Sequence, residues 1–426
     1  MSALHALLAL RQRRPRFVAG SLAALGFLLS YPAIHWWLNS LGIAGEFGFY
    51  DFGVYRTAVA HWEAGEALYV PNEDGGYHGS YLYPPVFVLL FVPLSDMAFR
   101  QAAIVWNAVS VALLWVGLQA LVATYRVRLA WYERGLLLWA ILGFQPVILS
   151  MRLGQVSVFL AGLLAVALAA MRHAENGTGG PAAQYASGAL TAVPGTMKLI
   201  FAPAGAHLLQ NRRRFAGAVG MGLTLLVVSV AVFGVDSHRA YLDVLAWGKG
   251  WGESRDPRLW GVAYYRPLYV IGATASLVVR FALAALISVL ALLTTDEGLD
   301  SEVFALGVAA IPFIAPRAYT QDLAIFLPVV VVLIASELSR NDGGRPLVPV
   351  IGLWLAAVHA YGLYALVNVL PGRVPGGAFI AAHAGYLQPG LWATLLLMGL
   401  PLVRVIQATN IVETLENRFP WVPVPL

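Results

Sequence analysis

Residues 212–235 read RRRFAGAVGMGLTLLVVSVAVFGV, three arginines followed by an uncharged run that extends to Val235. A bilayer-spanning α-helix needs about 20 consecutive, mostly apolar residues. Lipid offers the backbone no hydrogen-bond partners, so such a run has to form a helix, and arginines beside it favour the cytoplasmic side. The run also lacks the alternation of apolar and polar residues that marks the strands of a membrane barrel. This stretch therefore predicts an all-α membrane protein.

The composition of the whole chain supports the same prediction. Of its 426 residues, 59% are hydrophobic and 12% are charged, against about 25% charged in soluble domains. The net charge of +5 does not indicate nucleic-acid binding, because the basic residues sit in short loops between apolar runs, where they set topology. The absence of cysteine excludes disulfides and thiolate chemistry. The sequence also contains no phosphate-binding loop, nucleophile elbow or dinucleotide motif.

We predict a single integral membrane domain over residues 1–426, with about twelve transmembrane helices and both ends in the cytoplasm. The expected segments are a first span retained as a helix (17–38), a first outer loop with juxtamembrane helices (39–100), a helical core (101–235), a second outer loop (236–266) and C-terminal helices (267–426). The short run Val86–Leu94 is expected to lie half-sunk in the outer leaflet. Residues 185–210 are expected to form two short helices that meet near Lys198, which keeps the arginine triplet inside.

The carboxylate most suited to catalysis is Asp51, which lies in Tyr50-Asp51-Phe52-Gly53-Val54-Tyr55-Arg56 just beyond the first span. Charged residues beside membrane spans are costly and mark functional sites. Aromatic neighbours would desolvate Asp51 and raise its pKa, which suits a general base. Asp51 could also cap a helix that runs through His61, and the two roles are compatible.

Three basic residues on separate outer turns are candidate phosphate ligands, namely Arg152, Lys198 and Arg317. Arginine binds a phosphate bidentately and lysine binds it as a point charge, although each of these side chains could instead snorkel to the lipid headgroups. The second outer loop, rich in Trp and Tyr, is either an interfacial aromatic belt or a surface for sugar or lipid. The histidines show no metal-ligand spacing, so we predict neither a metal site nor a cofactor.

Several pieces follow Asp51 along the chain: Gly65-x-x-Leu68-Tyr69, Tyr81-Leu82-Tyr83-Pro84-Pro85-x-Phe87, Pro93-Leu94, Trp106-Asn107, Gly154-Gln155-Val156, and Lys198 with Pro203 ahead of the arginine triplet. This order resembles the GT-C superfamily of membrane glycosyltransferases, and most closely glycosyltransferase family 87. The resemblance runs to about Arg214 and then thins. In a late outer turn, Tyr319 replaces the usual Trp of the family, and Gln321 and Asp322 stand where His is expected.

The resemblance implies a GT-C fold and an inverting glycosyltransferase at the outer face of the plasma membrane. The donor would be a sugar, mannose, on dolichyl or undecaprenyl phosphate, and the acceptor a glycolipid or glycan. Asp51 would act as general base, while Lys198, Arg152 and Arg317 would hold the donor phosphate. The further substrate-binding residues that we predict are Tyr55, Arg56, Tyr83, Gln155, Tyr319, Gln321, Asp322 and Arg266.

Two other classes of function fit the residues. A transporter or flippase of lipid-linked sugars would use the same basic outer cavity without needing a base at Asp51, although no internal repeat is evident. A non-catalytic membrane assembly protein would tolerate the loss of both Asp51 and Lys198. Within the enzyme class, the donor could carry a pentose. The residues alone leave enzyme and transporter open, and the resemblance favours the enzyme.

Overall fold

The computed structural model describes residues 2–73, 75–77, 79–248, 264–295, 298–315, 318–340 and 343–409. Within these ranges, eight helices are long and apolar enough to cross a membrane, or up to nine if the bent pair α5 and α6 forms one span. The predicted all-α, multi-pass fold is therefore confirmed. The predicted number of about twelve transmembrane helices exceeds the eight or nine candidate spans of the described residues, because it included shorter segments such as residues 303–315, most of which belong to the buried helix α11 (Asp300–Ile314).

The helices long enough to span are α2 (Pro15–Ser40), α4 (Phe99–Thr124), α7 (Ser157–Glu175), α9 (Arg212–Gly248), α10 (Ala273–Leu293), η6 (Thr320–Ile325) with α12 (Phe326–Ser339), α13 (Leu347–Tyr364) with η7 (Ala365–Val369) and η8 (Leu370–Gly372), and α16 (Pro389–Ala408). The shorter helices are α1 (Ala3–Ala9), α3 (Tyr50–Glu63), η1 (Pro85–Leu90), η2 (Val92–Leu94), α5 (Trp131–Leu142), α6 (Gln145–Leu153), α8 (Gly180–Met197), η3 (Leu199–Gln210), η5 (Tyr269–Ile271), α14 (Gly377–Ala382) and α15 (Ala384–Leu387). Two short strands, β1 (Tyr264–Tyr265) and β2 (Ala318–Tyr319), pair antiparallel with Tyr264 opposite Tyr319.

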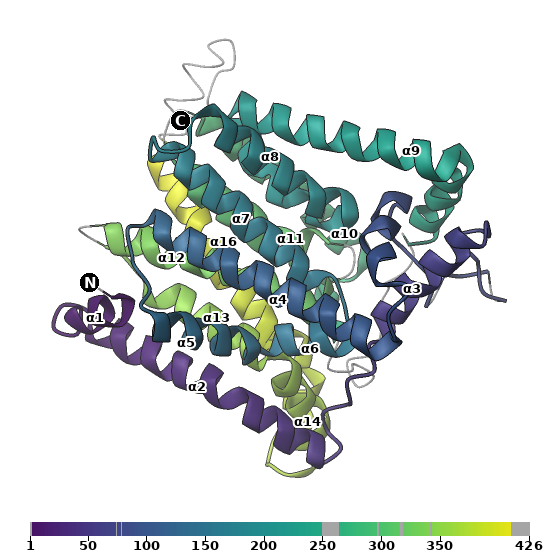
Figure 1. The fold of residues 1–426 in the computed structure, drawn as a ribbon. Coiled ribbons are helices and arrows are strands. Elements are labelled where there is room, and N and C mark those ends of the chain that lie inside the picture. Colours follow the sequence, from purple (N-terminus) through teal and green to yellow (C-terminus); the bar gives the residue numbers. More distant parts are fainter. Residues whose placement is uncertain are drawn as a thin grey trace.

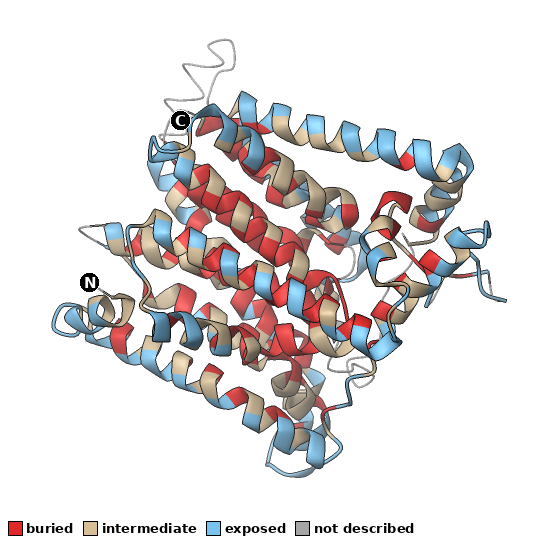
Figure 2. Cartoon of the chain, in the orientation of Figure 1, coloured by how far each residue is buried: buried red, intermediate tan, exposed pale blue. Residues whose placement is uncertain are grey.

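The core of the bundle is formed around α7 and α11, most of whose residues are buried (Figure 2). Helix α9 differs, because it lies at the edge of the bundle and exposes apolar side chains such as Leu223, Leu226 and Val227 (Figures 1 and 2). Lipid tails are as apolar as leucine, so this surface carries no penalty in a bilayer. The exposed apolar face of α9 is therefore a lipid-facing surface.

Glycines allow α8 and α9 to approach each other closely. A Cβ atom at Gly188 would overlap the carbonyl oxygen of Arg214. We expect Gly188→Ala to push the helices apart and to lower the free energy of unfolding by about 1–3 kcal/mol, as overpacking does. Thermal unfolding in detergent measures this effect, and Gly220→Ala on α9 is the control, because no atom lies within 4 Å of a Cβ there. A Gly188→Ala variant as stable as the wild type would contradict this contact.

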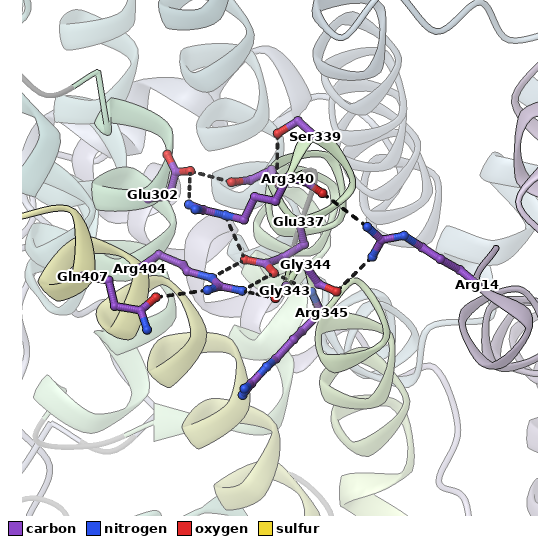
Figure 3. A network of polar contacts seen from close by, with 11 residues as sticks. Arg14, Glu302, Glu337, Ser339, Arg340, Gly343, Gly344, Arg345, Arg404 and Gln407 are labelled. Carbon is purple, nitrogen blue, oxygen red and sulfur yellow. Dashed lines mark hydrogen bonds and ion pairs between the residues drawn. The ribbon is translucent and has the colours of Figure 1, made fainter.

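Several helix ends are joined by one polar network at the end of the bundle that also holds α1 (Figures 1 and 3). Glu337, near the end of α12, is buried and accepts two hydrogen bonds from Arg404 of α16, at 2.8 and 2.7 Å. The backbone N–H of Arg345 donates to the same carboxylate at 2.6 Å. Arg14, at the start of α2, donates to the carbonyl of Gly344 at 2.9 Å. These contacts bring α2, α12, α13 and α16 together at this end.

The opposite end of the bundle carries α3 and the outer loop that follows it (Figure 1). Helix α9 bends at Gly234, whose φ of 72° lies in the left-handed region, and its last turns pack on this part of the chain. Phe233 contacts Trp62 of α3, with ring centroids 5.4 Å apart, and Tyr241 contacts Tyr69 at 5.8 Å. The second half of α9 therefore covers the outer loop instead of leaving it open to solvent.

Two predicted short elements also lie near this end. Helix α8 ends at Met197 and η3 begins at Leu199, so the two short helices expected to meet near Lys198 do so. Lys198 itself has an extended backbone, with φ of −124° and ψ of 102°. The run Val86–Leu94 forms the short 3₁₀ helices η1 and η2, which are too short to cross a bilayer. These interrupted helices leave room for a cavity beside Lys198.

Candidate active site

A cavity of about 1050 Å³ opens beside α3 and Lys198, at the upper end of the volumes usual for small-ligand sites. Eight of the predicted site residues line it: Asp51, Tyr55, Tyr83, Gln155, Lys198, Tyr319, Gln321 and Asp322. The cavity continues as an apolar limb between η3, α9 and α10, lined by side chains that include Pro203, Phe215, Leu245 and Ile287. It therefore has one polar end and one apolar end.

The start of α3 places Asp51 at the polar end. Phe49 precedes the helix in a left-handed conformation, with φ of 49°, and its N–H donates to the carbonyl of Arg152 at 2.8 Å. This bond joins the start of α3 to the end of α6. Asp51 lies in the first turn, where the helix dipole favours a negative charge, but the capping position belongs to Phe49. The alternative role of Asp51 as an N-cap is therefore not realised.

Gly154 brings the α6–α7 turn against α3. Its φ of 68° is left-handed, and a Cβ atom there would lie 2.6 Å from Cβ of Phe52. Only glycine combines this conformation with such a close approach. The turn directs Gln155 and Ser157 toward the cavity region. This explains why a glycine directly precedes Gln155.

A buried ion pair lies at the centre of the polar end. Nζ of Lys198 is 2.9 Å from Oδ1 of Asp322, whose side chain is only 1% exposed. Ser157 donates its hydroxyl hydrogen to the same oxygen at 2.7 Å and accepts from Lys198 at 3.2 Å. The N–H of Tyr319 donates to the second carboxylate oxygen at 3.2 Å. Asp322, predicted to contact substrate, is thus occupied in holding Lys198.

Hydroxyl and amide groups extend this cluster toward α3. Oε1 of Gln155 accepts from the N–H of Ser157 at 3.0 Å, and its Nε2 lies 3.4 Å from the hydroxyl of Tyr83. The hydroxyls of Tyr83 and Tyr55 are 3.2 Å apart, and Tyr69 donates to the carbonyl of Tyr83 at 2.6 Å. The polar end is therefore held in one arrangement by a continuous hydrogen-bond chain.

Asp51 differs from these residues, because its half-buried carboxyl has no hydrogen bond or ion pair within the described part of the chain. Burial raises the pKa of Asp51 to about 6, a rise that the Lys198 ammonium reduces and the Asp322 carboxylate increases. A carboxyl with this pKa is mostly ionised at neutral pH and is more basic than an ordinary aspartate. It is suited to accept a proton from a molecule in the cavity.

Among the described residues, three of the predicted site residues are not part of this lining. Arg152 lies behind the start of α3, where its Nε is 3.4 Å from the carbonyl of Glu46. Arg56 donates to the carbonyl of Ser95 at 3.0 Å, and the backbone of Arg266 is bonded to Gln388. Arg317 lies outside the described residues. Lys198 is therefore the only cation in the described lining.

Sequence reasoning missed Ser157, which bridges Gln155, Lys198 and Asp322. The available signal was a hydroxyl residue at the start of an apolar run, two positions after Gln155. Helix starts accept many polar residues, so the signal alone is weak. Among the described residues, no group of three or more His, Asp or Glu side chains is arranged to hold a metal ion.

The comparisons with known proteins identify a family. The model of glycosyltransferase family 87 matches residues 81–316, which is more than half of the chain. This range includes Tyr83, Gln155 and Lys198 but begins after Asp51 and ends before Asp322. No curated protein and no solved structure matches the chain.

Proposed function

This chain belongs to glycosyltransferase family 87, and we propose that it transfers mannose from a polyprenyl phosphate carrier to a hydroxyl of a glycolipid or glycan. The observation that carries this proposal is the Asp51 carboxyl, which has no hydrogen bond or ion pair among the described residues and lies beside the Lys198–Asp322 pair, at the polar end of a cavity whose other limb is apolar. A sugar, a phosphate and a long hydrocarbon chain need these three environments side by side.

In the proposed reaction, Asp51 takes the proton of the acceptor hydroxyl while the hydroxyl oxygen bonds to the anomeric carbon of the donor sugar. The bond from that carbon to the phosphate oxygen breaks, and the polyprenyl phosphate leaves with the electron pair. Attack from the face opposite the phosphate inverts the configuration, as in the base half of an inverting glycosidase. No general acid is required, because the phosphate leaves as a stable anion.

Lys198 supports the phosphate end of the donor in this proposal. Asp322 and Ser157 take two of its three N–H groups, which leaves one for a ligand in the cavity. A fixed cation stabilises the charge that grows on the leaving phosphate without any reorganisation during the reaction. Arg317 stays a proposed second ligand, while Arg152 is withdrawn from this role because it does not line the cavity.

The apolar limb fits the carrier chain. Its walls come from η3, α9 and α10, and α9 and α10 also expose apolar side chains to the lipid. A polyprenyl chain that moves from the bilayer into this limb exchanges one hydrocarbon environment for another, so little free energy opposes the transfer. We therefore propose that the donor enters laterally from the membrane.

We propose that both termini are cytoplasmic and that Asp51 faces the extracytoplasmic side of the plasma membrane. Arg14, Arg340 and Arg404 gather at the end of the bundle that holds α1 (Figures 1 and 3), and α3, whose first turn contains Asp51, lies at the opposite end (Figure 1). Basic residues favour the cytoplasmic side. A lipid carrier is the expected donor on the other side, where nucleotide sugars are absent.

The donor can be tested with purified protein and radiolabelled sugars. We expect transfer from polyprenyl-phosphate mannose to a lipid extract or glycan acceptor, and none from GDP-mannose. The product should carry the anomeric configuration opposite to that of the donor, which NMR of the product reads directly. Transfer from the nucleotide sugar, or retention of configuration, would contradict the proposal; a preference for a polyprenyl-phosphate pentose would correct the sugar only.

The pH dependence of transfer should follow the ionisation of the Asp51 carboxyl. Because the base has to be ionised, and burial raises its pKa to about 6, kcat/KM should fall tenfold per pH unit below about pH 6. Above that pH the rate should level off as the carboxylate becomes fully ionised. The measurement is kcat/KM from pH 4.5 to 8.5 with donor below its KM. A profile that is flat down to pH 4.5 would exclude Asp51 as the base.

A further inference from the structure

A second cavity, of about 320 Å³, lies on the other face of α3 and has no role in the reaction described above. The two cavities share three lining residues, Val54, Gly79 and Ser80. The smaller cavity is therefore separated from the larger one by one side of α3 and a short piece of the outer loop. Its volume is at the lower end of the range for small-ligand sites, about 300–1,000 Å³.

The spacing along α3 explains how one helix serves two cavities. Tyr50, Gly53, Thr57 and His61 recur every three or four positions, so they share the helix face that lines the smaller cavity. Asp51 lies on the neighbouring face, which lines the larger cavity. Successive residues of a helix lie on different faces, so Asp51 does not line the smaller cavity, and the link between the two cavities runs along the lining that they share at Val54, Gly79 and Ser80.

The lining of the smaller cavity suits an uncharged molecule with many hydroxyl groups. Tyr50 is 73% exposed, and its ring is backed by Gly48, where a Cβ atom would lie 2.6 Å from that ring. Thr57 is an exposed residue whose hydroxyl has no hydrogen bond within the described residues, and the imidazole of His61 can donate or accept, with its Nε2 3.8 Å from a carboxylate oxygen of Glu66. No Asp, Glu, Lys or Arg belongs to the described lining. An aromatic face beside hydroxyl and imidazole groups matches the apolar face and polar edge of a sugar ring.

We infer that the smaller cavity binds the acceptor as a neutral carbohydrate, with a sugar ring on Tyr50 and one hydroxyl directed past Val54 to Asp51. This inference rests on the proposed function and adds the class of acceptor to it. The two substrates then occupy different surfaces: the lipid-linked donor lies in the large cavity, and the acceptor glycan reaches the base from the other face of α3. A free hydroxyl on a neutral sugar is what the base requires.

Direct measurement of glycoside binding tests the proposed acceptor site without relying on turnover. The probes are methyl α-mannoside, methyl α-glucoside and methyl α-galactoside, each titrated to millimolar concentration against detergent-solubilised protein and followed by saturation-transfer NMR. We expect wild type to bind at least one of them. Thr57→Trp fills the cavity and should weaken that binding at least about tenfold, because a filled site excludes the ligand by steric clash. Thr57→Val keeps the shape, loses the hydroxyl and should weaken binding by a smaller factor.

Ala60→Trp is the matched control, since Ala60 is an exposed residue of the same helix and lines neither cavity. It should bind the glycosides as wild type does. If no glycoside binds to wild type, or if Thr57→Trp and Thr57→Val both bind like wild type, the inference is overturned.

Asp51→Asn separates this inference from the proposed function, because it should lose transfer and keep glycoside binding. If Asp51→Asn still transfers the sugar, the catalytic proposal is rejected, and the proposed carbohydrate site is unaffected. If Asp51→Asn loses transfer but the Thr57 variants bind glycosides as wild type does, the carbohydrate site is rejected and the catalytic proposal is kept.

Discussion

Replacement of Asp51 by Asn is expected to lower kcat/KM for sugar transfer by about 10²–10⁴-fold, the usual contribution of a general base. The amide has the shape of the carboxyl but cannot accept a proton at neutral pH. The acceptor hydroxyl would then have to attack with its proton in place. The measurement is transfer from radiolabelled polyprenyl-phosphate mannose by purified wild type and variant at pH 7.5.

The loss should not come from misfolding. Burial raises the pKa of Asp51 from 3.8 to about 6, so ionisation favours the unfolded chain: the cost to the folded state builds up as the pH rises from 3.8 and is complete above about pH 6. The uncharged amide removes this cost, and Asp51→Asn should melt at or above the wild-type temperature at pH 7.5. Asp96→Asn, at an exposed aspartate that lines neither cavity, should leave transfer unchanged.

Turnover like that of wild type in Asp51→Asn would remove the base from the mechanism. The protein would instead be a transporter if it moves the lipid-linked sugar between leaflets without forming a glycosidic bond, at equal rates with Asp or Asn at position 51. Reconstituted vesicles with the labelled donor in one leaflet distinguish these outcomes.

Replacement of Lys198 by Met is expected to impair both stability and transfer. The substitution leaves the Asp322 carboxylate, only 1% exposed, without its counter-ion. Breaking such a buried pair typically costs about 3–5 kcal/mol. Transfer should also fall about 10²–10³-fold, the range found when one donor that stabilises charge in the transition state is removed. The measurements are thermal unfolding in detergent, and kcat and KM for the lipid-linked donor.

A second substitution separates the two effects. In Lys198→Met with Asp322→Asn, no charge remains at this buried pair, and the single oxygen of the new amide can still accept from Ser157 or from Tyr319, which Asp322 accepts on separate oxygens. Most of the lost stability should return, because the unpaired charge caused it. Transfer should stay low, because the cation that faces the cavity is missing. If transfer recovers together with stability, Lys198 is a structural residue and does not act on the donor phosphate.

Most of the membrane fold could be predicted from local sequence. The run 215–235, the first spanning helix and the break at Lys198 all follow from the number of consecutive apolar residues and from the prolines and charges that interrupt them. The length of a span depends only on bilayer thickness, so no knowledge of neighbouring helices is needed. The bend between α5 and α6, in contrast, was not predicted, although Gly143 and Pro146 lie at it and are residues that commonly end and begin helices.

The candidate site was predicted in part. Asp51, Tyr83, Gln155 and Lys198 were selected from their chemistry and order, and they line one cavity. Arg152 was selected by the same reasoning, yet its side chain lies behind α3 near Glu46. Side-chain direction at a helix end depends on how the helix turns, and the left-handed Gly154 sets that turn.

Two properties of the chain are determined by its sequence alone. One is its division into membrane helices, which follows from local hydropathy, and the other is the type of residue available for catalysis. The pairing of Lys198 with Asp322, the bridging position of Ser157 and the division of α3 between two cavities are not local. They join positions as far apart as 157 and 322, and no short-range pattern encodes which distant side chains will meet. Packing of the helices brings these groups together and leaves the Asp51 carboxyl without a hydrogen bond or ion pair in the described part of the chain, because every hydrogen bond of the cluster is formed among other residues.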